Sequence, residues 1–139
     1  MVDFARTIEA EKENVEKALD NLTLVMERQD KSIIELAAIA TFLHNVYNGI
    51  ENILKQILKS ENTKIFKTAT WHKDILKISI SKGIIPEELS DELFEYLSFR
   101  HFFVHGYSFM LKEEQLINLA NGIKDVWKNF IKSVEDYIK

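Results

Sequence analysis

Glycine and proline are scarce in this chain, whose 139 residues contain 4 Gly and 1 Pro. An all-β sandwich or barrel uses turn residues about every 8–12 positions, so the composition argues against both architectures. Long helices that are joined by few turns need far fewer of these residues. The sequence therefore predicts an all-α fold. Its length fits one compact domain over residues 1–139.

Apolar residues recur every three or four positions along two long stretches, residues 4–25 and 33–58. This spacing predicts two amphipathic helices, which the polar residues 28–32 separate. The second stretch carries an additional apolar row. A helix that is apolar on two sides lies at the centre of a bundle or in a subunit interface.

The second half of the chain contains clear helix boundaries. We expect residues 59–69 to form a loop and residues 71–81 a short helix, with Thr70 as its cap and Gly83 after its end. Pro86 begins the next helix, because its fixed φ suits a first turn, and this helix runs to about His105.

Gly106 can stop that helix, and a last helix begins within residues 112–114. The prediction is an antiparallel bundle of four to five helices. The surplus apolar surface of residues 33–58 would be buried if two chains formed a symmetric homodimer.

The charge is uneven along the chain. The net charge is −4, but residues 55–82 hold seven lysines against Glu61 and Asp74, which gives +5. A local positive surface on an acidic protein can hold phosphates. An ordinary solvated face would show the same composition. The candidates for RNA binding are Lys64, Lys67, Lys73 and Lys77.

The absence of cysteine excludes a disulfide scaffold, thiolate zinc sites and cysteine nucleophiles. Acidic residues occur from the start of the chain, where a signal peptide would be apolar. No stretch approaches about 18 uncharged apolar residues, so we expect no membrane span. The expected location is the cytoplasm.

Residues 100–107, Arg-His-Phe-Phe-Val-His-Gly-Tyr, concentrate chemically useful side chains at a helix end. Metal-free RNA cleavage needs a base for the ribose 2′-hydroxyl, an acid for the leaving 5′-oxygen and a fixed cation for the phosphate. The imidazole of His105 suits proton transfer, and the guanidinium of Arg100 suits the phosphate. His101 is a possible auxiliary group, because it lies four residues before His105 on the same helical face.

The spacing of Arg100 and His105 constrains this hypothesis. Residues five apart in a regular helix point about 140° away from each other. Either the turn at Gly106 re-aims His105, or two chains assemble the site across a twofold axis.

Arg100, His105 and Tyr107 match the R-x4-H-x-Y signature of HepT-type toxins in the HEPN superfamily of helical ribonucleases. The order of the predicted helices also resembles that of HepT-like proteins over nearly the whole chain. The resemblance implies a HEPN-like helical bundle that dimerises and places the signature in a cleft between protomers.

The resemblance also implies a function. A protein of this kind is the toxin of a type VII-like toxin–antitoxin pair and cleaves RNA (tRNA or mRNA) without metal, by 2′-hydroxyl attack. Arg100 and His105 would be catalytic. Tyr107 would be the AMPylation target of a partner antitoxin, an MntA-type nucleotidyltransferase that uses ATP. The chain itself would need no cofactor.

Several alternatives stay open at this stage. Arg100 and His105 can be an ion-pair partner and a helix-terminal cation, and Tyr107 can be a tyrosine that packs with a polar tip. His101 can be a surface residue or, with His105, a zinc pair. The chain as a whole can be a helical interaction module that binds a nucleotidyltransferase or RNA without cleaving it, or a regulatory RNA-binding dimer.

Other aromatic residues and histidines have less specific patterns. We expect core or interface positions, or base stacking, for one aromatic group: Phe99, Phe102, Phe103 and Phe109. His44 and Tyr47 are expected to be buried or interfacial polar groups, with a role near the cleft as the alternative. His72 is expected at the surface.

Overall fold

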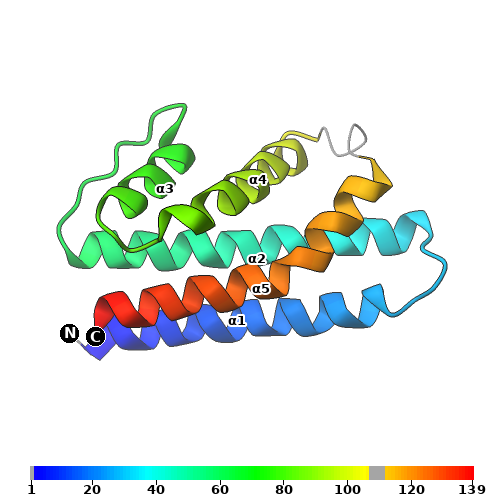
Figure 1. Cartoon of the computed structure of the whole chain (residues 1–139), viewed down its shortest axis with the longest axis horizontal. Helices are drawn as coiled ribbons and strands as arrows, with labels where there is room; N and C mark the ends of the chain where they lie inside the picture. The colour runs from blue at the N-terminus through cyan, green and yellow to red at the C-terminus, as the bar shows by residue number, and fades with distance from the viewer. Residues whose placement is uncertain (1, 107–111) are drawn as a thin grey trace.

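The computed structural model describes residues 2–106 and 112–139, with side chains from Phe4 onward. The described residues form five helices and no strand (Figure 1). The helices are α1 (Val2–Met26), α2 (Ile33–Ser60), α3 (Trp71–Ser81), α4 (Glu87–Val104) and α5 (Glu113–Ile138). The predicted all-α bundle is therefore confirmed.

Helix α2 is the centre of the bundle and contacts each of the other four helices. Helices α1 and α5 lie along one side of α2, and α3 and α4 lie along another (Figure 1). The apolar pattern on two sides of residues 33–58 thus belongs to a central helix. The homodimer that this pattern also suggested stays a prediction.

Aliphatic side chains of α2 fill the core, and Leu43, Ile50 and Leu54 are all 0% exposed. Burial of each such side chain stabilises the fold by about 1.5–3 kcal/mol. Helix α1 approaches α2 very closely at Gly49, where an added Cβ would lie 2.1 Å from Cγ2 of Val15. Glycine at this position allows α1 and α2 to pack closely against each other.

The helix boundaries agree with the sequence analysis to within about two residues. Gly83 and Gly106 have φ angles of +81° and +73°, which suit glycine in the turns after α3 and α4. Pro86 immediately precedes α4, as predicted. Thr70 precedes α3, but its hydroxyl donates to the Asp74 carboxylate instead of capping the backbone.

By length and composition alone, α2 is also apolar enough to cross a membrane. Its sequence contains Glu35 and Glu51, however, and its buried residues are those that face the other helices. An apolar helix that packs on several sides is the pattern of a core helix.

Candidate active site

A groove with a volume of about 950 Å³ runs between α3, the loop before it and the second half of α4. Its walls carry most of the cationic and imidazole groups that the sequence analysis selected. The polar and aromatic side chains that line it include Thr68, Thr70, Trp71, His72, Lys73, Lys77, Arg100, His101 and His105. The groove therefore gathers residues that are up to 37 positions apart in the sequence.

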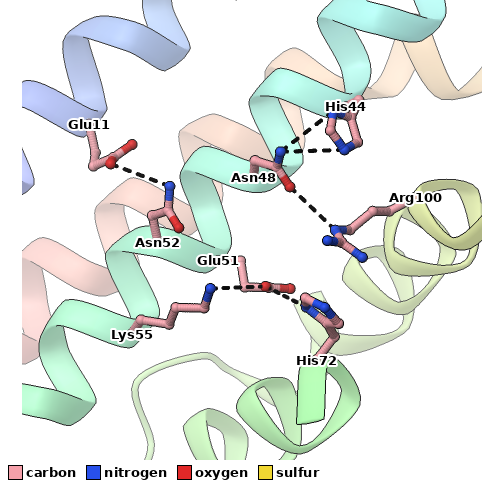
Figure 2. A network of polar contacts seen from close by, with 8 residues as sticks. All are labelled: Glu11, His44, Asn48, Glu51, Asn52, Lys55, His72 and Arg100. Carbon is pink, nitrogen blue, oxygen red and sulfur yellow. Dashed lines mark hydrogen bonds and ion pairs between the residues drawn. The ribbon is translucent and has the colours of Figure 1, made fainter. Parts of the chain in front are cut away.

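Arg100 is half-buried on α4 and is anchored to α2. Its Nε donates to Oδ1 of Asn48 over 3.3 Å (Figure 2). This bond orients the guanidinium plane through Nε. Within the described residues the terminal nitrogens form no further hydrogen bond, so both are available for a phosphate.

His44 supports the same anchor from one turn earlier on α2. Its ring lies 3.4 Å from Nδ2 of Asn48 and stacks on Phe103 with a centroid separation of 4.5 Å. Burial lowers the pKa of His44, and the positive charge of Arg100 lowers it further. His44 is therefore neutral near pH 7 and adds no charge beside Arg100.

Tyr47 is fully buried beneath this region. Burial raises the pKa of its hydroxyl well above the usual range, and the nearby Glu51 contributes in the same direction. The buried-polar prediction for Tyr47 is confirmed. His44 is in contact with the residue that anchors Arg100, which agrees with the expected alternative of a role near the cleft.

His101 and His105 are neighbours at the end of α4. Their ring centroids are 4.4 Å apart, which confirms that they share a helical face. His105 is the first residue after the helix, and its N–H donates to the His101 carbonyl over 3.1 Å. One chain thus brings Arg100 and His105 to one groove. His105 reaches the groove while it keeps the helical face of His101, and assembly of the site from two chains stays a prediction.

His72 is not the surface residue that we expected. It lines the groove, and its Nδ1 lies 2.6 Å from Oε1 of Glu51, a buried carboxylate of α2 that is 3% exposed. The same carboxylate oxygen lies 3.6 Å from Nζ of Lys55 (Figure 2). The expectation was wrong because position 72 faces α2, which the sequence of α3 alone does not reveal.

The sequence analysis also did not predict the buried polar contacts of Asn48 and Glu51, although the sequence contains a signal for them. Polar residues recur at intervals of four, three and four along the apolar α2, at His44, Asn48, Glu51 and Lys55. Such a row forms one helical face. A polar row on a central helix predicts buried polar contacts, because buried polar groups need partners.

The four candidate RNA-binding lysines separate in the fold. Lys73 and Lys77 line the groove. Lys64 and Lys77 line a smaller hollow beside it, and Nζ of Lys67 lies 5.6 Å from the Trp71 ring centroid. Lys73 and Lys77 therefore place positive charge on the α3 side of the groove. Their role in RNA binding stays a prediction.

The aromatic group behaves in part as expected. Phe99 belongs to the core, and Phe103 packs against the core while it stacks on His44. Phe102 lines a separate hollow between α4 and α5. Phe109 and the signature residue Tyr107 lie outside the described residues.

No group of three or more His, Asp or Glu side chains that could hold a metal ion occurs in the part of the chain that the structure describes. The groove itself presents a guanidinium, imidazoles and ammonium groups. Such a set can bind a phosphodiester and transfer protons.

Comparison with known proteins identifies the class. A family model described as HepT-like protein matches residues 38–139, from α2 to the end of the chain. The chain therefore belongs to the HepT-like family, a branch of the HEPN superfamily. This family is associated with toxin–antitoxin pairs, and its members are usually ribonucleases. The predicted family is confirmed.

A solved structure is also similar. It is that of YutE from Bacillus subtilis, a cytosolic protein of unknown function, with a TM-score of 0.78 and 19% sequence identity. The match covers 96% of this chain and 90% of that chain, and it shows a shared fold. No curated protein matches this chain in sequence.

Proposed function

We propose that this chain is the toxin of a type VII-like toxin–antitoxin pair and a metal-independent endoribonuclease. One observation carries the proposal: in a HepT-like chain, Arg100 and His105 of the R-x4-H-x-Y signature line one groove together with Lys73 and Lys77. The groove combines the fixed cation and the proton-transfer group that RNA cleavage without metal needs.

The reaction begins when the ribose 2′-oxygen attacks the adjacent phosphorus and loses its proton to a base. The phosphorus–O5′ bond then breaks, and the leaving oxygen takes a proton from an acid. The products are a 2′,3′-cyclic phosphate and a 5′-hydroxyl. Arg100 neutralises the charge that accumulates on the phosphate, and His105 performs one of the two proton transfers.

Regulation is proposed to act on Tyr107. A partner nucleotidyltransferase of the MntA type would join the tyrosine oxygen to the α-phosphate of ATP and release pyrophosphate. Tyr107 lies two positions after His105 in the sequence. The added negative charge would therefore lie close to the groove and repel RNA. We further propose that the protein is a homodimer and that it is cytoplasmic. The location is supported by YutE, which has the same fold and is cytosolic.

Cleavage is tested with purified protein, total tRNA or mRNA and EDTA. We expect fragments that end in a cyclic phosphate, and we expect Arg100→Ala and His105→Ala to lower the rate by about 100-fold or more. Arg28→Ala is the matched control, because Arg28 is exposed in the turn after α1. Intact RNA at high protein concentration would favour the non-catalytic interaction module. Binding with steep salt dependence but no cleavage would favour a regulatory RNA-binding dimer.

The modification is tested by intact-mass measurement after incubation with the partner transferase and ATP. We expect a mass increase of one or more AMP units in the wild type and none in Tyr107→Phe. Tyr137→Phe is the control, because Tyr137 lies at the end of α5 and its hydroxyl donates to Glu61. A mass increase that persists in Tyr107→Phe would refute the assignment.

A further inference from the structure

A buried carboxylate lies directly behind the groove. Glu51 is 3% exposed, and its Oε1 is 2.6 Å from Nδ1 of His72 and 3.6 Å from Nζ of Lys55. Its Oε2 is buried and has no hydrogen-bond partner within the described residues. A carboxylate in this position costs free energy by desolvation unless it is paired. His72 and Lys55 are the partners that this carboxylate has in the fold.

The short contact fixes the tautomer of His72. Lys55 is held between Glu51 and the Trp71 ring, 4.4 Å from the ring centroid, so Oε1 of Glu51 has Lys55 as a second neighbour beside His72. An ionised carboxylate only accepts hydrogen bonds, so the proton of neutral His72 resides on Nδ1. Nε2 then carries the lone pair that a general base needs.

The position of His72 is suited to the reaction. His72 from α3 and Arg100 from α4 both extend toward the same stretch of α2 (Figure 2). Both residues line the groove that also contains His105. RNA cleavage needs two proton-transfer groups around one phosphate, and the groove offers an imidazole on each wall.

We propose that His72, oriented by Glu51, is the general base of the groove and that His105 is the general acid. The inference rests on the proposed function. Nε2 of His72 takes the proton of the 2′-hydroxyl as the 2′-oxygen bonds to phosphorus. His105 gives its proton to the 5′-oxygen as the phosphorus–O5′ bond breaks. Glu51 is a positioning residue, which holds the tautomer and stabilises the imidazolium that forms on His72.

The division of roles is tested with two RNA substrates, one normal and one in which sulfur replaces the leaving 5′-oxygen. A thiolate leaves without protonation, so the second substrate does not need the acid. We expect His72→Gln to lower kcat by about 100-fold or more on both substrates. We expect His105→Ala to be impaired on the normal substrate and to recover on the sulfur substrate.

Glu51→Gln tests the positioning role, because it removes the carboxylate charge at nearly constant shape. We expect a smaller loss of kcat than for His72→Gln, with KM unchanged. Glu61→Gln is the matched control: Glu61 accepts from Tyr137 and pairs with Lys82 outside the groove. Circular dichroism and thermal unfolding establish that each variant is folded. Nitrogen NMR of the wild-type imidazoles supplies a readout that is independent of activity, and we expect the proton of neutral His72 on Nδ1.

Each outcome decides the inference. A folded His72→Gln with wild-type kcat, its recovery on the sulfur substrate, or a His72 proton on Nε2 would overturn it while the proposed function stands. A wild-type protein that cleaves no RNA would overturn the proposed function and this inference together.

Discussion

Two asparagines one turn apart on α2 show how differently the two sides of this helix are used. Asn52 donates to Oε1 of Glu11 on α1 over 3.4 Å, whereas Asn48 accepts from Arg100 on α4 over 3.3 Å (Figure 2). The contact with α1 lies beside the tight packing of Gly49 against Val15. The contact with α4 lies beside the groove. The α1 side therefore serves stability, and the α3–α4 side orients groups that are suited to chemistry.

The largest effect on stability is expected where α1 meets α2. Gly49→Ala places a Cβ 2.1 Å from Val15 Cγ2, which forces the helices apart and lowers the free energy of unfolding by about 1–3 kcal/mol. Chemical denaturation measures this loss. Gly122→Ala is the control, because its Cβ would lie 3.3 Å from the Tyr96 hydroxyl, a milder approach. A loss of RNA cleavage per folded Gly49→Ala molecule would contradict the division between the two sides.

The next effect concerns the orientation of Arg100. Asn48→Ala removes the acceptor that holds Nε of Arg100. We expect the rate of RNA cleavage to fall by about ten-fold, which corresponds to the free energy of one hydrogen bond to a charged group. Asn52→Ala is the matched control, since it removes an asparagine of the same helix that contacts α1. Equal cleavage rates in the two variants would show that Asn48 does not orient Arg100.

The smallest effect is a dependence of stability on pH. The pKa of His44 is lower in the folded protein than its ordinary value of 6.5, first because of burial and then because of Arg100. The unfolded chain therefore binds the proton more readily, and stability should fall as the pH drops below 6.5. Denaturation midpoints between pH 7.5 and pH 5 measure the slope. His44→Gln should flatten it, and an unchanged slope would assign the effect to other groups.

Much of the candidate site could be predicted because its signals are local. The R-x4-H-x-Y signature lies within eight residues, and the four-residue spacing of His101 and His105 alone placed their rings together. The contacts of His72 and Arg100 with α2 could not be predicted in this way. Their partners Glu51 and Asn48 lie 21 and 52 residues away in the sequence, and no local periodicity selects such pairs.

The amino-acid sequence by itself determined the helices, their ends and the family. Helix formation depends on neighbours three and four residues apart, and the turns depend on single residues such as Gly83, Pro86 and Gly106. The tertiary structure decided which helices meet, and with that the Glu51–His72 and Asn48–Arg100 contacts and the groove in front of them. The packing of apolar faces determines which helices contact each other. Burial then requires each polar group between those helices to find a partner.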